Sequence, residues 1–342
     1  MKAIVLEGVG EVDLLVEREV ETPRVGPGEV LLKVAGCGIC YRDVLARKGF
    51  MKTKTPVIPG HEVSGYVVEV GEGVDSLEKG DLVASLIYSF DARDPECSEG
   101  RENICRSTRW LGEDMDGCYA EYIKLPHWIL KRVGDPGEAP PEAYSFAACV
   151  VGTVLRALKT LGGARKGECA LVTGASGGVG IHAVQVARSL GLKVIGVTRS
   201  EEKARLIEKY GADNVIVYRD RFSEEARRLT EGRGPEIIVE TVGGPTLDQS
   251  LRSVARGGRV MVIGNVDPRP QQVLLGLIIL REVKVQGVLN STLRELEEAI
   301  NILKRGEVKP VYRPIKLEAG EVREAHKILE RGGSMGRIVI KP

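Results

Sequence analysis

Two cysteines and one histidine of this chain have side chains that could together hold a metal ion. Cys40 ends the glycine-rich segment GCGIC, and His61 lies in the sequence PGHE. Cys149 lies much further along the chain, in AACVVGT. Two thiolates and one imidazole with a fourth position open form the ligand set of a catalytic zinc ion. We therefore predict that Cys40, His61 and Cys149 bind Zn²⁺ and that this ion takes part in the reaction.

The sequence LVTGASGGVG at residues 171–180 could bind a phosphate group. An apolar run, 169–173, leads into it, and apolar residues with helical spacing follow it. A strand, a glycine-rich turn and a helix form the setting in which backbone N–H groups bind a pyrophosphate. The spacing is G-x-x-G-x-x-G with one added glycine, not the strict G-x-G-x-x-G. The predicted phosphate-binding residues are Gly174, Ser176, Gly177, Gly178, Val179 and Gly180.

The next predicted strand, 193–197, indicates which nicotinamide cofactor binds. It ends at Thr198, Arg199 and Ser200, and Lys203 follows shortly after. NAD-binding folds usually carry an acidic residue at this strand end, which accepts from the ribose 2′-hydroxyl. A cationic and hydroxylic end instead fits a 2′-phosphate, which the planar guanidinium of Arg199 could bind with two N–H groups. The sequence predicts NADP(H), with a solvated basic turn as the alternative.

Two patterns of hydrophobic residues must position these segments. Residues 1–35, 65–70 and 81–86 alternate as strands do and are separated by glycine and proline, which predicts a β-rich unit. From Cys169 to about Val288, strands and helices alternate, which predicts a doubly wound parallel sheet and an α/β fold class. The predicted strands are 169–173, 193–197, 214–218, 236–240 and 258–263, and the predicted helices are 179–190, 201–210, 223–231 and 245–255.

The end of the chain is expected to rejoin the β-rich unit. Helical patterns at 293–304 and 319–331 precede a final strand that begins near Gly336. We therefore predict a catalytic domain at residues 1–148, to which residues 290–342 return. A nucleotide-binding domain is predicted at residues 149–289.

Composition excludes several classes of partner. The net charge of +1 argues against a nucleic-acid surface. The apolar stretch Val273–Leu280 is shorter than the ~20 residues that span a bilayer, and residues 1–10 have a strand pattern, not that of a signal peptide. We expect a cytoplasmic enzyme that acts on a small molecule, with no nucleic-acid or membrane partner. Abundant charges with few Asn and Gln are typical of thermophilic proteins.

The remaining cysteines and histidines have structural interpretations. The chain has seven cysteines, an odd and scattered set that favours metal ligands and buried thiols over a disulfide framework. Intracellular proteins of hyperthermophiles do form disulfides, which keeps that alternative open. The residues expected to be buried thiols are Cys37, Cys118 and Cys169, and the histidines expected to be structural are His127, His182 and His326.

Over essentially its whole length, the sequence resembles the zinc-containing alcohol dehydrogenase-like branch of the medium-chain dehydrogenase/reductase superfamily. The resemblance rests on the motifs described above, together with Asp43 three residues after Cys40 and Glu62 after His61. It implies a GroES-like β-rich catalytic domain and a Rossmann domain. It assigns the zinc to Cys40, His61 and Cys149, with Glu62 as an acidic neighbour that could also reach the metal. Asp43 would accept from the other ring N–H of His61 and fix its tautomer.

The resemblance implies further cofactor contacts, and its members associate through the last strand of the Rossmann sheet. The apolar segment at 277–287 is expected to be a β edge of this kind, which would form a dimer or a tetramer. The additional cofactor contacts that the resemblance implies come from Thr153, Tyr218, Gly264 and Asn265.

The chain departs from zinc alcohol dehydrogenases at the residue before Asp43. Those enzymes carry Ser or Thr there to pass on the alcohol proton, whereas this chain has Arg42, which stays protonated and cannot act as that relay. Tyr41-Arg42-Asp43 instead resembles quinone reductases, polyketide enoyl reductases and archaeal acryloyl-CoA reductases. In such an enzyme Tyr41 could donate a proton or hold the carbonyl oxygen, or simply pack beside the pocket. Arg42 could also bind a cofactor phosphate.

A second departure lies in the segment 87–110. Many relatives have four cysteines there that bind a structural zinc, and this chain keeps their spacing with Asp91, Asp94, Cys97 and Cys105. Carboxylates can bind zinc, so a mixed site is chemically possible but would be weaker than four thiolates. A Cys97–Cys105 disulfide and an empty loop are the alternatives.

Three functions are compatible with these residues. The first, which we predict, is a zinc-dependent, NADP(H)-linked alcohol dehydrogenase or carbonyl reductase, because the ligand set is complete. The second is an NADPH-dependent reductase of an enoyl thioester or another conjugated carbonyl, which Arg42 favours. The third, an NADPH-binding protein without catalysis, leaves the open metal position unexplained.

Overall fold

The computed structural model describes residues 1–98 and 100–342, which form two compact units. The first unit comprises 1–152, 291–306 and 312–342, and the second comprises 153–290 and 307–311. Cys149 belongs to the first unit, not to the predicted nucleotide-binding domain. The reason is that its helical segment, Ala147–Gly152, packs against α9 (Leu293–Lys304).

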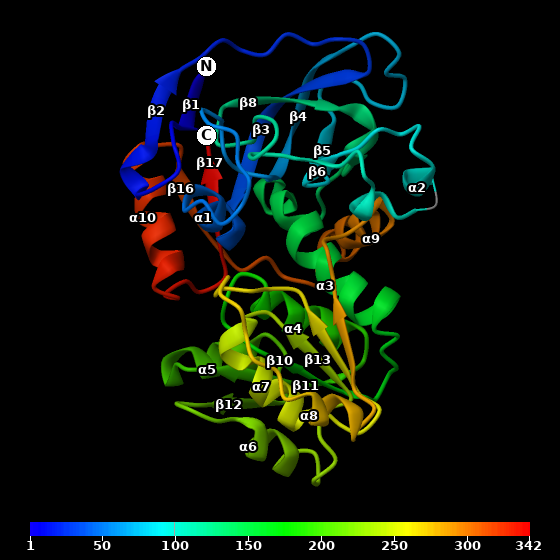
Figure 1. Cartoon of the computed structure of the whole chain (residues 1–342). Helices are drawn as coiled ribbons and strands as arrows, with labels where there is room; N and C mark the ends of the chain where they lie inside the picture. The colour runs from blue at the N-terminus through cyan, green and yellow to red at the C-terminus, as the bar shows by residue number, and fades with distance from the viewer. Residues whose placement is uncertain (99) are drawn as a thin grey trace. The chain divides into compact units, whose positions relative to one another are not determined.

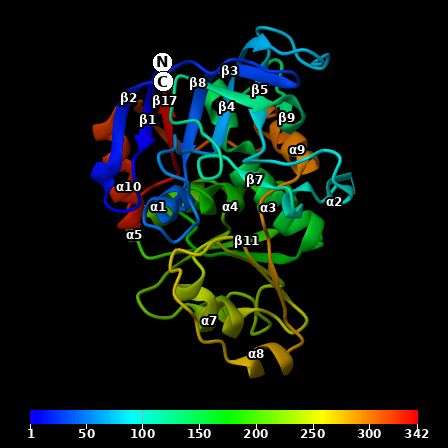
Figure 2. The same ribbon diagram turned by 45° about the horizontal axis from the view of Figure 1, so that its top comes forward.

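The first unit is built around a mainly antiparallel sheet whose longest strand is β3 (Glu29–Ile39) (Figure 1 and Figure 2). The strand order is β16-β17-β3-β4-β5-β9, and β8 also pairs with β3. The last strand of the chain, β17, is antiparallel to β3, so the C-terminal segment joins the sheet of β3, while β1 and β2 pair as a separate two-stranded sheet. The other elements of this unit are β1 (Lys2–Leu6), β2 (Leu15–Glu19), α1 (Tyr41–Arg47), β4 (Glu62–Val70), β5 (Leu82–Ser85), β6 (Tyr88–Ser89), α2 (Pro95–Ser98), β7 (Arg109–Trp110), β8 (Tyr122–Pro126), β9 (Leu130–Arg132), β16 (Tyr312–Lys316), α10 (Ala319–Glu330) and β17 (Arg337–Lys341).

The second unit is a six-stranded parallel sheet with the order β12-β11-β10-β13-β14-β15, of which Figure 1 labels β10 to β13. In sequence order this is 3-2-1-4-5-6, the doubly wound dinucleotide-binding topology. The predicted fold class is confirmed, and each element predicted between 169 and 263 has its ends within three residues of the observed ones. The elements are α3 (Thr153–Leu155), β10 (Cys169–Val172), α4 (Gly180–Ser189), β11 (Lys193–Thr198), α5 (Glu201–Lys209), β12 (Asn214–Val217), α6 (Ser223–Arg228), β13 (Ile237–Glu240), α7 (Gly244–Ser253), β14 (Arg259–Val262), α8 (Leu275–Ile279) and β15 (Lys284–Gly287).

The apolar segment at 277–287 is not the continuous strand that its composition predicts. Residues Leu275–Ile279 form the short helix α8, and only Lys284–Gly287 form a strand, β15, at the edge of the sheet. Leu280, which is 76% exposed, ends the helix. The parallel pairing with β14 begins only at Lys284, so the residues before it adopt a helical turn.

By length and composition alone, the helical stretch Pro141–Leu161 could cross a membrane. Most of it is buried within the protein, as is usual for a core helix, so it is weak evidence for a membrane location. The cytoplasmic location stays a prediction.

Two disulfides join cysteines of the first unit, Cys37 with Cys118 and Cys97 with Cys105. The prediction that Cys37 and Cys118 are free thiols is therefore wrong. Cys37 lies on β3, the Cys118 N–H donates to the Gly60 carbonyl (3.1 Å), and the two Cα atoms are 5.8 Å apart. Cys169 is a buried free thiol, as expected, and Cys40 and Cys149 are also free.

We predict that the denatured, unreduced protein titrates three thiols and that reduction raises this number to the full seven cysteines of the sequence. The Cys37–Cys118 bond closes a loop of 81 residues, so a Cys37→Ala, Cys118→Ala protein should lose about 4 kcal/mol of stability. Thiol titration, peptide mapping and denaturant unfolding measure these changes. Seven thiols without reductant would contradict both disulfides.

Candidate metal and cofactor site

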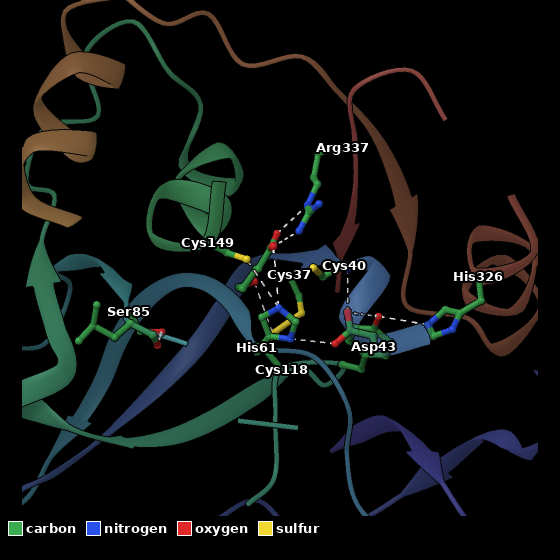
Figure 3. Close-up of a disulfide and its surroundings, with 12 residues drawn as sticks. Cys37, Cys40, Asp43, His61, Ser85, Cys118, Cys149, His326 and Arg337 are labelled. Carbon is green, nitrogen blue, oxygen red and sulfur yellow. Dashed lines mark hydrogen bonds and ion pairs between the residues drawn. A yellow bond between two sulfur atoms is a disulfide. The ribbon is translucent and has the colours of Figure 1, made fainter. Parts of the chain in front are cut away.

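Four potential metal-binding side chains of the first unit converge on one point (Figure 3). They are Cys40, His61, Glu62 and Cys149, and their ligand atoms all lie within 4.8 Å of one another. The Cys149 Sγ is 3.8 Å from His61 Nε2, which in turn is 4.0 Å from a Glu62 oxygen. Two sulfurs, an imidazole nitrogen and a carboxylate at these spacings fit a zinc ion.

Asp43 orients two of these donors through its two carboxylate oxygens. One oxygen lies 2.9 Å from His61 Nδ1, which leaves Nε2 facing the cysteines. The other accepts from the backbone N–H of Cys40 (2.8 Å), the residue that caps the start of α1. The sequence placed Asp43 beside His61, and its bond to Cys40 follows from its position in the first helical turn.

Glu62 is held by a residue that sequence reasoning missed, Arg337 on β17. The Arg337 Nε donates to Glu62 (2.9 Å) and a second N–H of the same guanidinium donates to the other oxygen, with Glu62 fully buried. Strand β3 lies between β17 and β4, and a Cβ on its Gly38 would come within 2.0 Å of the Glu62 carboxylate. Gly38 therefore leaves the space that this ion pair occupies.

The cluster favours one thiolate beside protonated neighbours. A hydrogen bond from Cys149 and the charges of Arg337 and His61 outweigh burial and hold the pKa of Cys40 well below its usual value. The bond to Cys40, burial and the nearby negative charges raise the pKa of Cys149 well above its usual value. Burial lowers the pKa of His61, but Asp43 and Cys40 together raise it to about 10.

The structure gives Arg42 partners of its own. Its Nε and a terminal nitrogen donate to the two carboxylate oxygens of Glu113 (2.5 and 2.9 Å), and its guanidinium lies 4.3 Å from the centre of the Trp110 ring. Burial alone would lower the pKa of Arg42, but Glu113 and the thiols of Cys40 and Cys149 raise it. The predicted contact of Arg42 with a phosphate stays a prediction, as does the role of the half-buried Tyr41, the first residue of α1.

In the second unit the glycine loop lies between β10 and α4, at the point where the strand order reverses. Gly174 has a φ of 55°, and a Cβ there would meet Thr241 from the loop after β13. A Cβ on Gly180 would come within 2.1 Å of the Gly174 carbonyl, so the helix start and the turn are in close contact. His182 binds the Gly178 carbonyl (2.7 Å), and its other nitrogen accepts from Val311 N–H (3.1 Å).

The other predicted loop residues lie as follows. Ser176, Gly177 and Gly178 are half-buried within the turn, and Val179 directly precedes α4. Gly264 packs directly on the Thr241 carbonyl, and Asn265 accepts weakly from Gly244 N–H (3.5 Å). The hydroxyl of Thr153 donates to Asn290 (3.4 Å).

The end of β11 brings most of the residues predicted for a 2′-phosphate into one place. Thr198 pairs with the end of β12, where Tyr218 N–H donates to its carbonyl (3.0 Å). The hydroxyl of Ser200 accepts from Lys203 N–H (3.3 Å) and caps α5, while Arg199 is exposed. Burial raises the pKa of Tyr218 above its usual value, and the positive charge of Arg199 partly offsets this effect.

The structure brings together three of the four residues of the predicted mixed metal site at 91–105. Asp94, Cys97 and Cys105 lie together, but Asp91 binds Arg93 through both carboxylate oxygens (3.0 and 2.9 Å). That pairing lowers the pKa of Asp91 to about 2. The two cysteines are joined in a disulfide, the alternative that the sequence had left open.

Glu240 at the end of β13 is a buried carboxylate that sequence reasoning also missed. It accepts from the hydroxyls of Thr173, Thr246 and Ser250 and from two backbone N–H groups of the following turn. These bonds fix the loop after β13 next to the glycine loop. The sequence does carry a signal for this residue, because Glu240 is an acidic residue at the end of an apolar predicted strand.

Residues 178–305 match the family model described as zinc-binding dehydrogenase, and residues 26–135 match the alcohol dehydrogenase GroES-like domain. The chain is 42% identical, over the full length of both proteins, to an acryloyl-coenzyme A reductase of Sulfurisphaera tokodaii. The chain belongs to the zinc-type medium-chain dehydrogenase/reductase family. It is therefore an oxidoreductase, as predicted.

Two further members of this family are informative. An alcohol dehydrogenase of Geobacillus stearothermophilus is 36% identical, with 95% of this chain and 94% of that protein covered. A zinc-binding dehydrogenase of Sinorhizobium meliloti, solved with NADP bound, is 27% identical, with a TM-score of 0.84 and 100% and 99% of the two chains covered.

We predict that zinc binding to the metal-free protein releases about two protons at neutral pH. Zinc ligands must be deprotonated, and the raised pKa values of His61 and Cys149 leave both protonated beforehand. Zinc affinity should consequently fall as the pH decreases. Calorimetry in buffers of different ionisation enthalpy measures the release. Cys169→Ser, at a free thiol outside the cluster, is the control and should release the same number; zinc binding without proton release would contradict the assignment.

Proposed function

We propose that this protein is an NADPH-dependent reductase that transfers hydride to the β-carbon of a conjugated acyl thioester. The observation that carries the proposal is the position of Arg42, directly before Asp43, where an alcohol dehydrogenase of this family needs a hydroxyl to pass on a proton. The guanidinium is fixed by Glu113 and Trp110 and does not release a proton at physiological pH. The full-length similarity to a protein named acryloyl-coenzyme A reductase supports the same substrate class.

In this reaction the chain must guide one hydride and one proton. A nicotinamide cofactor bound at the glycine loop would supply the hydride to the β-carbon of the substrate, and the alkene electrons would move onto the thioester oxygen. The α-carbon then takes a proton, for which the Tyr41 hydroxyl is our proposed donor. The positive charge of Arg42 favours the negative charge that develops on the oxygen. The products are the saturated thioester and NADP⁺.

The cradle formed by Cys40, His61 and Cys149 is proposed to hold a zinc ion. When bound, the ion supplies a Lewis acid that polarises a carbonyl oxygen. Asp43 keeps the imidazole and the Cys40 backbone in place for it. The buried pair of Glu62 and Arg337 keeps a carboxylate beside the site without leaving its charge unpaired.

We infer that the cofactor is NADP(H). Arg199 is exposed at the end of β11, next to Tyr218 and to the Ser200–Lys203 cap, and residues 198–200 include no carboxylate that would repel a 2′-phosphate. The glycine loop at the N-terminus of α4 provides the pyrophosphate site. The NADP bound to the Sinorhizobium meliloti relative supports the same cofactor.

The complete zinc cradle also favours a second candidate, a zinc-dependent alcohol dehydrogenase or carbonyl reductase. The same donor set that polarises a thioester would polarise an aldehyde or ketone and direct hydride to the carbonyl carbon. The alcohol dehydrogenase of Geobacillus stearothermophilus is a relative of this kind.

We also infer self-association through β15. It is an edge strand, and the adjoining Leu274, Leu275, Ile279 and Leu280 are each more than half exposed. A dimer or tetramer in the cytoplasm is the form we expect, and sedimentation measures it.

A conjugated aldehyde tests the two functions in one assay. With NADPH deuterated at C4, we expect the label on the β-carbon and a saturated product, and we expect faster turnover of acryloyl-CoA. An allylic alcohol labelled at the carbonyl carbon would instead establish the carbonyl reductase. Arg42→Lys, which loses the two-point contact with Glu113, should slow thioester reduction about 10- to 100-fold. Arg18→Lys, at an exposed ion pair of the same unit, should not.

Cofactor choice is tested at Arg199. Arg199→Ala should lower kcat/KM for NADPH about 10- to 100-fold, because a charge-assisted contact to the 2′-phosphate is lost, and leave NADH kinetics nearly unchanged. Arg205→Ala, at an exposed arginine on the following helix α5, is the matched control. Equal losses with both cofactors would contradict a role in 2′-phosphate binding.

A further inference from the structure

Figure 3 shows His326 on the side of Asp43 that faces away from Cys149 and His61. Tyr119 is hydrogen-bonded to both Asp43 and His326. The Tyr119 hydroxyl donates to the same Asp43 oxygen that accepts from Cys40 N–H, at 3.0 Å. His326 Nε2, on α10, lies 3.3 Å from the Tyr119 hydroxyl, and the two rings meet edge to face with centroids 6.2 Å apart. Both residues are completely buried.

The direction of each hydrogen bond follows from the donors available. Tyr119 has a single hydroxyl proton, and the Asp43 carboxylate can only accept, so that proton points to Asp43. The bond between His326 and Tyr119 then requires the proton on His326 Nε2. His326 Nδ1 has no hydrogen-bond partner among the described residues, and in this tautomer it carries no proton that would need one. A single chain of donors therefore runs from His326 through Tyr119 to Asp43.

Tyr119 is fixed against the loop that carries His61. Its N–H donates to the Pro59 carbonyl (3.0 Å), and its carbonyl accepts from Ile4 N–H (2.8 Å). A Cβ on Gly60 would come within 2.3 Å of the Tyr119 ring, so the absence of a side chain at that position lets the ring lie directly under the loop. The neighbouring disulfide at Cys118 ties this segment to β3.

We propose that Tyr119 and His326 are positioning residues for the metal site, which they serve by fixing the Asp43 carboxylate. A carboxylate held by the Tyr119 hydroxyl keeps the ring of His61 and the backbone of Cys40 in fixed positions relative to Cys149. The inference rests on the zinc site of the proposed function. Neither residue touches the cluster itself, so their loss should change how tightly and in what geometry a metal is held.

Zinc affinity and a cobalt spectrum of the full-length protein test this. The protein is stripped with a chelator, and zinc is titrated in competition with a chromogenic chelator. Cobalt is then added, because its d–d absorption reports the ligand geometry. Tyr119→Phe, which removes one oxygen atom, should weaken zinc binding about 10- to 100-fold and shift the cobalt bands. His326→Leu should act in the same direction, and His326→Gln, whose amide can donate to Tyr119, should largely restore wild-type values.

The matched control is Tyr144→Phe. It also removes a hydroxyl from a fully buried tyrosine of the same unit, but that hydroxyl donates to the Pro136 carbonyl. Its zinc affinity and cobalt spectrum should equal those of the wild type, whatever its effect on thermal stability.

Wild-type zinc affinity and cobalt bands in Tyr119→Phe would overturn the positioning role while leaving the zinc site and the proposed reaction intact. A wild-type protein that binds no stoichiometric zinc would overturn both this inference and the zinc cradle. The deuterium-labelling assay reads the site of hydride transfer independently of either result.

Discussion

The Asp43 carboxylate has to satisfy three donors at once, and much of the first unit is arranged around that requirement. It accepts from the ring of His61, the backbone of Cys40 and the hydroxyl of Tyr119. A buried carboxylate is costly unless its lone pairs are filled, so these bonds hold the carboxylate and its donors in place together. Because Asp43 also lies in the first turn of α1, the same carboxylate stabilises the start of the helix and orients the residues of the metal cradle.

Close packing around this carboxylate depends on positions without side chains. Gly38 leaves room for the pair between Glu62 and Arg337, and Gly60 leaves room for the ring of Tyr119. Arg337 comes from the last strand of the chain, so the C-terminal return completes the charge balance of the site. Removing Arg337 would leave Glu62 as a buried, uncompensated charge, which is far more costly than losing an exposed ion pair.

The parts of the structure that the sequence predicts are those with local signals. The alternation of strands and helices gave the second unit with nearly correct boundaries, because each element carries its own hydrophobic period. The donors Cys40 and His61 were found from short motifs, and Asp43 from its place in one of them. The prediction of a continuous strand at 277–287 is wrong because a short apolar run fits a helix as well as a strand. Only pairing with β14 decides where β15 begins.

The parts that the sequence does not predict are pairings between distant segments. Three such pairs are joined by the topology of the sheet or by the packing of α10, and no spacing in the sequence indicates them. They are Cys37 with Cys118, Glu62 with Arg337, and Tyr119 with His326. At Asp91 a spacing in the sequence does point to a site, because its distance from the two cysteines fits a four-ligand metal site. In the structure, however, both of its carboxylate oxygens accept from Arg93, two residues away.

Arg42 is the position at which the sequence and the structure bear most directly on function. A guanidinium placed alone beside the thiols would be a partly buried charge without a partner. The chain instead provides the Trp110 ring of β7 for stacking and Glu113, three residues later, for two-point pairing. Two residues from a separate segment thus hold the guanidinium in one orientation beside the thiols of the cluster. In the thioester reduction that we propose, a positive charge fixed in this way would favour the oxygen that becomes negative.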